Sequence, residues 1–229
     1  RVPRYIAVGM HSNNHQFEEE RERRASRVGT VAKATCPHPR ARVQFLSYAT
    51  RGYAAKYEPH RKLIDCYASK RGIPVLLLDP YVYEECDAFH DMYFLRHCVT
   101  SLFLKCADYT FFFDLDVVPQ VELDDWEPYL TPHDLVFAQV TEGGEIAAGS
   151  FLVRDTDYAR GFLMDWASRE SWQKCFNADG DQVPLHQLLM DRVPMGSHER
   201  AECDAALEKQ KWPYEVQVWI KCAVWWIRV

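Results

Sequence analysis

The stretch YTFFFDLD, residues 109–116, carries the pattern that decides the fold. A short, continuous apolar run of this kind predicts a strand that is buried on both faces, as in the parallel sheets of α/β proteins. The run ends in two carboxylates, Asp114 and Asp116, with one leucine between them. Side chains two apart on a strand point the same way, so we expect both acids at the carboxyl end of this strand, where ligands of such sheets bind.

The segments before this strand alternate between strand and helix patterns. Residues 43–49 and 73–79 are apolar runs, whereas residues 58–72 and 91–108 carry apolar side chains at helical spacing. A strand, a helix and a second strand in this order predict parallel βαβ units. The sequence therefore predicts an α/β fold with a Rossmann-like, mostly parallel mixed sheet and helices on both faces.

The segments after residue 116 continue the alternation. Strands are expected at residues 135–140 and 150–154, with a glycine-rich turn before the second, and an amphipathic helix at residues 158–171. The polar stretch NADGDQ, from residue 177, leads into a last helix. A further short strand is expected at residues 4–10.

The domain organisation follows from these patterns. Residues 1–42 are expected to form a partly charged N-terminal extension, and residues 43–229 a single domain. The chain begins at Arg1 and ends within the apolar stretch AVWWIRV, so we interpret it as a segment cut from a longer protein. A membrane anchor, if the protein has one, would lie outside this segment, because no apolar run approaches the roughly 20 residues of a membrane span.

Charge and cysteine content narrow the function classes. A net charge of -6 argues against a general nucleic-acid binder and against a polybasic membrane-binding surface. The eight cysteines include no CxxC pair, which argues against a zinc site. Their even number suits a secretory protein with disulfides, although Cys98 and Cys106 are equally compatible with small core residues on a helix.

The two acids need a physical explanation. Two uncompensated carboxylates buried together are costly, so a cation is their natural partner, and carboxylate oxygens favour Mg²⁺ or Mn²⁺. The plain alternative is that Asp114 and Asp116 are simply solvated at a strand end.

One enzyme class with this motif is the haloacid-dehalogenase type of phosphatase. In that interpretation Asp114 is the nucleophile and Asp116 the acid/base, and later roles fall to Thr141, Lys174 and the pair Gly180–Asp181. The motif normally lies on the first strand of that core, whereas here a complete βαβα segment precedes it.

Three blocks of the sequence point to a different class. HCVTSLFLKCADYTFFFDLDVVPQ, EIAAGSFLVRDTDYARGFLMDWA and ADGDQVPLHQLLMD together resemble a nematode-expanded domain family of uncharacterised glycosyltransferases. That family is similar to the galactosyl/xylosyl-transferase family of yeast α-mannan galactosyltransferases and plant xyloglucan xylosyltransferases. The resemblance covers roughly residues 43–191 and implies a GT-A nucleotide-diphospho-sugar transferase fold.

The resemblance implies a donor site around the two acids. Asp114 and Asp116 match the motif that holds a metal and the diphosphate of the nucleotide sugar. Ala148, Gly149 and Ser150 match a turn that approaches the donor sugar. Gly143 and Gly144 would add backbone freedom to that turn.

Further positions follow from the same resemblance. Asp181 and Gln182 match a pair at a helix start that contacts the sugar opposite the metal, and they are the expected catalytic residues. Two alternatives stay open: Asp181 only caps the helix, or Asp179 takes the role given to Asp181. By topology, Tyr48 and Thr50 would lie where the uracil and ribose bind.

Three other side chains have two interpretations each. Trp166 and Trp172 are either stacking surfaces for an acceptor sugar or, as is commoner for tryptophan on a helix, core residues. His186 lies in the third block, but a histidine on a helix face is more often packed than catalytic.

The sequence departs from the family at one point. A third metal ligand, a histidine near the C-terminal end of the domain, is usual there, and His198 has a different context. Either this ligand lies beyond Val229, or the metal site is incomplete and activity is in doubt.

The expected function is that of a metal-dependent, retaining glycosyltransferase. It would move a hexose or pentose from a nucleotide sugar, most simply UDP-linked, to a glycan or glycoprotein, with Mn²⁺ or Mg²⁺ as cofactor. The resemblance places it in the Golgi or another secretory lumen as part of a type II membrane protein. The alternatives are the phosphatase described above and an inactive glycosyltransferase-fold binding domain.

Overall fold

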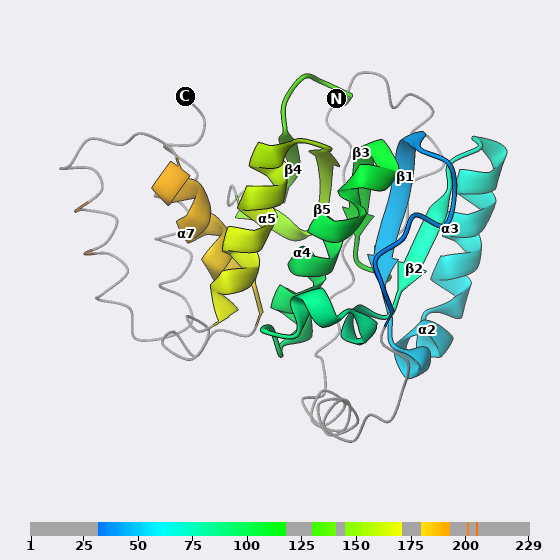
Figure 1. The fold of residues 1–229 in the computed structure, drawn as a ribbon, viewed down its shortest axis with the longest axis horizontal. Coiled ribbons are helices and arrows are strands. Elements are labelled where there is room, and N and C mark those ends of the chain that lie inside the picture. The colour runs from blue at the N-terminus through cyan, green and yellow to red at the C-terminus, as the bar shows by residue number, and fades with distance from the viewer. Residues whose placement is uncertain are drawn as a thin grey trace.

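The computed structural model describes residues 32–117, 130–140, 145–170, 180–192, 201 and 205, so the strand expected at residues 4–10 lies outside it. Five strands form one sheet in the order β2-β1-β3-β5-β4, as Figure 1 shows. The strands are β1 (Ala41–Tyr48), β2 (Val75–Leu78), β3 (Ala107–Phe113), β4 (Leu135–Val140) and β5 (Glu145–Arg154).

The strand directions make the sheet mixed but mostly parallel. β1 pairs in parallel with β2 and with β3, and Phe45 lies beside Val75 on one side and Phe111 on the other. β5 is antiparallel to both β3 and β4, so β4 runs in the direction of β1, β2 and β3. The predicted α/β class with a mostly parallel mixed sheet is therefore confirmed.

The helices fall largely where apolar spacing predicts them. The helices in the described residues are α2 (Arg51–Lys56), α3 (Glu58–Lys70), α4 (Met92–Phe103), α5 (Asp157–Ser168) and α7 (Gln182–Arg192), with 3₁₀ turns at Pro80–Val82, Glu84–Cys86 and Leu104–Cys106. Asp91 and Thr156 begin α4 and α5, because each side chain accepts a backbone N–H of the first turn. The prediction at residues 91–108 is too long, since β3 already begins at Ala107.

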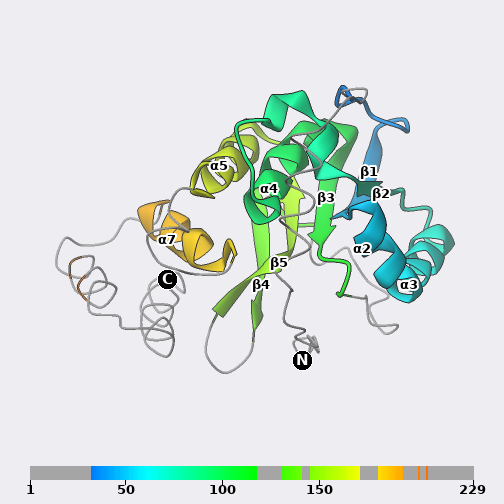
Figure 2. The ribbon, with the colours of Figure 1, turned by 90° about the horizontal axis from the view of Figure 1, so that it is seen from below.

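Alternating side chains of the central strands build two cores. Phe45 and Phe113 pack with Ile64 of α3 on one face of the sheet. Leu46 and Phe112 belong to the larger core on the other face, which α4, α5 and α7 cover. Figure 2 shows α4 and α5 on one side of β1 and β3, and α2 and α3 on the other. Helices therefore cover both faces, as predicted.

Two disulfides fasten α4 and the turn after it. Cys86 is bonded to Cys98 within α4, and Cys36 to Cys106 just before β3. Cys98 and Cys106 are therefore disulfide-bonded cysteines rather than free core residues. Cys66 is free and exposed on α3. In the part of the chain that the structure describes, every helix is too short or too polar to cross a membrane.

Candidate functional site

The two acids lie in a turn rather than on the strand. β3 ends at Phe113, and the backbone N–H of Val117 donates to the carbonyl of Asp114 at 2.8 Å. Leu115 is buried in the smaller core, while Asp116 is exposed. The expected strand through Asp116 is therefore wrong, because the chain turns after Phe113 and closes the hydrogen bond between Val117 and Asp114. The acids still lie at the carboxyl end of β3, which is the expected place.

The segment with Ala148, Gly149 and Ser150 does lie beside the first acid. The N–H of Asp114 donates to the carbonyl of Gly149 at 2.8 Å, and a Cβ at position 149 would lie 2.7 Å from Asp114 Oδ2. The expected turn here is wrong, since β5 is already extended from Glu145, which pairs with Val140 of β4. Glycine is needed because a carboxylate approaches the backbone so closely.

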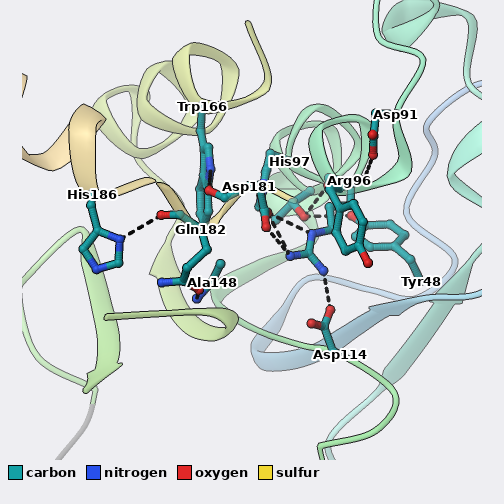
Figure 3. A network of polar contacts seen from close by, with 12 residues as sticks. Tyr48, Asp91, Arg96, His97, Asp114, Ala148, Trp166, Asp181, Gln182 and His186 are labelled. Atoms are coloured by element: carbon teal, nitrogen blue, oxygen red, sulfur yellow. Dashed lines mark hydrogen bonds and ion pairs between the residues drawn. The ribbon is translucent and has the colours of Figure 1, made fainter. Parts of the chain in front are cut away.

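A buried arginine connects this acid with the second expected site, and the sequence reasoning missed it. Arg96 of α4 is 5% exposed, and its guanidinium donates to Asp114 Oδ1 through Nη1. It also donates to Asp181 at distances of 2.8 and 3.0 Å from Nη2 and 3.2 Å from Nε. Figure 3 shows the guanidinium between the two carboxylates. The available signal was a lone cation within a mostly apolar helix, which needs a buried counter-ion.

Asp181 is a buried anion just before α7. It is 3% exposed, and its backbone carbonyl accepts from Trp166 Nε1 and from the N–H of Leu185, both at 3.0 Å. Gly180 precedes it with a φ of 98°, which favours glycine. Burial would raise the pKa of Asp181, but the charge of Arg96 and the contacts with His97 together outweigh this and hold the pKa below its ordinary value. The carboxylate therefore pairs with an arginine and does more than cap a helix.

His97 is a second residue that the sequence reasoning missed. Its ring stacks on Trp166 with 3.5 Å between centroids, and its Nε2 forms a hydrogen bond with Asp181 Oδ2. Both rings are fully buried, so the core interpretation of Trp166 is confirmed. Burial lowers the pKa of His97 to about 4, although Asp181 acts in the opposite direction. His97 is thus neutral at physiological pH.

Gln182 and His186 bind the backbone of β5. The Gln182 amide accepts from the N–H of Ala148 at 2.9 Å and donates to the carbonyl of Ile146. His186 Nε2 accepts from the N–H of Ile146 at 3.1 Å, so its Nδ1–H is the donor to the carbonyl of Gln182 at 2.8 Å. These contacts fix α7 against β5. They occupy both ends of the Gln182 amide, so the catalytic role that the resemblance implies stays a prediction.

Tyr48 and Thr50 have contacts inside the protein. Tyr48 is buried, and its hydroxyl donates to Thr100 Oγ1 at 2.8 Å, because Thr100 itself donates to the carbonyl of Arg96. Thr50 accepts the N–H of Tyr53 and begins α2. Their expected contact with a nucleotide stays a prediction. Burial, and then the charge of Asp116, raise the pKa of Tyr53, which follows these two residues in the sequence and lies on α2.

The charges around Asp114 favour a cation. Burial raises the pKa of Asp114 to about 7, because the opposing effect of Arg96 is partly offset by Asp181 and Asp116. Its side chain is 33% exposed, so solvent and solutes reach it. The charges of Asp181 and Asp116 both act on Asp114, Arg96 is the cation that opposes them, and His97 adds no charge. The excess of negative charge suits a divalent ion.

The described residues supply at most two ligands for such an ion. They contain no group of three or more His, Cys, Asp or Glu side chains arranged for a metal. Asp114 and Asp116 fit Mg²⁺ or Mn²⁺ nonetheless, because such ions commonly take one or two carboxylates and complete their shell with phosphate oxygens and water. Several expected residues lie outside the described part of the chain: Thr141, Gly143, Gly144, Trp172, Lys174, Asp179 and His198.

Comparison with known proteins gives one family. The family described as "Protein of unknown function, DUF273" matches residues 64–225, which is more than half of the 229 residues. The match includes α4, both acids, β5 and α7. No curated protein matches the chain.

Proposed function

We propose that this chain, which belongs to the DUF273 family, is a metal-dependent glycosyltransferase that uses a nucleotide sugar. The donor would be UDP-linked and the acceptor a glycan or glycoprotein. The proposal joins the resemblance of three sequence blocks to the arrangement of charged groups at one edge of the sheet.

The observation that carries the proposal is the contact of Arg96 with both Asp114 and Asp181. It joins the first and third blocks of the resemblance, and Gly149 of the second block touches the same Asp114 carboxylate. Segments far apart in the sequence thus meet around one solvent-accessible acid at the carboxyl end of β3. Such an edge is where α/β sheets bind nucleotides.

Asp114 and Asp116 would hold Mn²⁺ or Mg²⁺ together with the donor diphosphate. The ion supplies Lewis-acid stabilisation of the leaving nucleoside diphosphate when it is bound. Arg96 keeps a cation beside Asp114, and Asp181 keeps Arg96 in place. Gly149 leaves room for the Asp114 carboxylate. Retention of the anomeric configuration follows from the resemblance, and no nucleophile is assigned.

Two disulfides favour an oxidising compartment for this protein. A secretory lumen such as the Golgi is where a glycoprotein-modifying enzyme would meet both its acceptor and these conditions. The proposal therefore places the protein there.

Calorimetry with UDP, in the presence and absence of Mn²⁺, tests the proposal. The wild-type protein is expected to bind UDP only with Mn²⁺, and Asp114→Asn or Asp116→Asn to weaken binding at least about tenfold. Asp65→Asn, which changes an exposed carboxylate on α3, is the matched control and should bind as the wild type does. If the wild-type protein with Mn²⁺ binds neither UDP nor any UDP-sugar, the proposal is wrong.

Two further assays separate the alternatives. Release of UDP from a panel of UDP-sugars would show turnover, whereas binding without release would favour the inactive glycosyltransferase-fold domain. Hydrolysis of p-nitrophenyl phosphate that is lost in Asp114→Asn would favour the phosphatase.

A further inference from the structure

His97 is a fully buried histidine whose two ring nitrogens have different surroundings. Nε2 forms a hydrogen bond with Asp181 Oδ2, whereas Nδ1 has no hydrogen-bond partner among the residues that the structure describes. The ring lies flat on Trp166, with an interplanar angle of 15°, and its centroid is 6.4 Å from that of Phe112 and 6.2 Å from that of Phe151. Figure 3 shows the ring between Trp166 and the Arg96–Asp181 pair.

These contacts fix the protonation and the tautomer of His97. Asp181 carries a negative charge and only accepts, so the proton of the neutral ring lies on Nε2. A charged ring would also carry a proton on Nδ1, which would be buried without an acceptor at a cost of roughly 1–3 kcal/mol. His97 is therefore a neutral donor.

The Asp181 carboxylate receives several donors in a fixed plane. Oδ2 accepts from His97 and, at 2.8 Å, from Arg96 Nη2, while Oδ1 accepts from Nη2 at 3.0 Å. The same guanidinium has Nη1 left for Asp114. Because a guanidinium is planar and rigid, the orientation of the Asp181 carboxylate decides whether Nη1 reaches Asp114.

We infer that His97 is a positioning residue, whose Nε2–H holds the Asp181 carboxylate in the orientation that lets Arg96 contact Asp181 and Asp114 together. It does so without adding a positive charge, so the excess negative charge that attracts a cation is preserved. The stack on Trp166 fixes the ring plane. The consequence of this role for ligand binding rests on the proposed function, whereas its structural consequence does not.

Two variants separate the donor from the ring. His97→Phe keeps an aromatic ring against Trp166 but removes the N–H, and His97→Gln keeps an N–H donor but removes the ring. Phe103→Leu, a buried change at the end of the same helix and away from the acids, controls for a general loss of stability. Unfolding in urea is measured for all three so that the comparison is made between folded proteins.

Crystal structures of the variants are the readout that needs no ligand. The contact between Arg96 Nη1 and Asp114 is expected to be lost in His97→Phe and kept in His97→Gln and in Phe103→Leu. In wild-type protein, ¹⁵N NMR of the histidine rings should show His97 as the neutral Nε2–H tautomer. If the Arg96–Asp114 contact survives in His97→Phe, or if His97 is the Nδ1–H tautomer, the inference is overturned.

Binding of UDP with Mn²⁺ is the second readout. His97→Phe should weaken it about tenfold, and His97→Gln should restore it to within about threefold of wild type. Equal weakening in His97→Phe and Phe103→Leu would mean that His97 serves packing alone, and would overturn the inference. If wild-type protein does not bind UDP at all, the proposed function fails, and the variant structures still decide the role of His97.

Discussion

Arg96 and Asp181, 85 residues apart in the sequence, form a buried ion pair with N–O distances of 2.8, 3.0 and 3.2 Å. The pair joins the middle of α4 to the start of α7. Burial alone would lower the pKa of Arg96, but the charges of Asp114 and Asp181 more than compensate and raise it. The guanidinium is therefore a permanent cation in the interior.

Removing one partner of this pair should be strongly destabilising, because the other charge stays buried. Arg96→Met is expected to lower the free energy of unfolding by about 3–5 kcal/mol, and the double variant with Asp181→Leu by less. Urea unfolding of the two single variants and the double variant measures the coupling. Arg61→Ala, which breaks an exposed pair with Asp65, should cost under about 1 kcal/mol. Equal losses for Arg96→Met and Arg61→Ala would contradict a buried pair.

Gly149 is predicted to be essential for the position of Asp114. A methyl group there would lie 2.7 Å from Asp114 Oδ2, so Gly149→Ala must displace the carboxylate. Binding of Mn²⁺ and UDP by calorimetry should weaken at least about tenfold. Gly161→Ala in the middle of α5 is the control, because nothing lies within 4 Å of the new methyl group. It should stabilise the protein by roughly 0.5–1 kcal/mol without changing binding; unchanged binding in Gly149→Ala would remove Gly149 from the site.

Most of the fold could be predicted from local patterns. Runs such as residues 43–49 and 73–79 specify strands because side chains buried on both faces must be apolar. The ends of elements were less predictable. β3 stops at Phe113, where the chain turns and the N–H of Val117 donates back to the carbonyl of Asp114. β5 starts at Glu145 because β4 pairs with it and Gln182 of α7 binds its backbone. The contact with Gln182 comes from a residue distant in the sequence, which local patterns do not show.

The candidate site could be predicted only in part. Asp114, Gly149 and Asp181 lie close together, as the three blocks suggest. Arg96 and His97 are inside an apolar helix, and no spacing rule connects them with Asp181, which is 85 and 84 residues away. The sequence indicates that Arg96 needs a counter-ion, but only the folded chain brings Asp181 next to α4 and so identifies it.

Gln182 gives a test between a structural and a catalytic role. Its side-chain amide forms hydrogen bonds with the N–H of Ala148 and the carbonyl of Ile146. Gln182→Met should therefore lower the free energy of unfolding by about 1–3 kcal/mol, because both backbone groups lose their partner. Gln182→Glu should cost more, because a carboxylate would face the carbonyl of Ile146. Urea unfolding and UDP release are measured together. A loss of turnover with unchanged stability would instead support the catalytic role that the resemblance implies.

The disulfide between Cys86 and Cys98 should stabilise the helix that carries Arg96. It joins two cysteines with a sequence separation of 12. The double variant Cys86→Ser/Cys98→Ser should therefore have a free energy of unfolding about 3 kcal/mol lower than that of the wild type. The other bond, Cys36–Cys106, has a separation of 70, and its removal should cost about 4 kcal/mol. Urea unfolding of each double variant measures these losses. If a double variant is as stable as the wild type under oxidising conditions, the disulfide that it lacks does not form in the wild-type protein.

Two buried histidines should make the protein less stable in acid. Burial lowers the pKa of both His97 and His186 to about 4, against 6.5 for an ordinary histidine. Between these pH values the unfolded chain binds more protons at both positions, so stability falls as the pH falls. Asp114 acts in the opposite sense, because its folded pKa of about 7 lies above its ordinary 3.8, and its contribution grows as the pH falls through the same window. Because two histidines lower the stability and one carboxyl raises it, the net stability falls as the pH falls.

The expected loss is about 1.4 kcal/mol per pH unit between pH 6.5 and 4, the value for one net proton. His186→Gln removes one of the two histidines and keeps groups that can accept from Ile146 and donate to the carbonyl of residue 182. Its slope should therefore fall close to zero, because one histidine and Asp114 then nearly cancel. Urea unfolding at half-unit steps of pH, with no divalent ion present, measures both slopes. A wild-type stability that rises on acidification would mean that the Asp114 contribution exceeds that of the histidines, and that one of these rings is protonated in the folded protein.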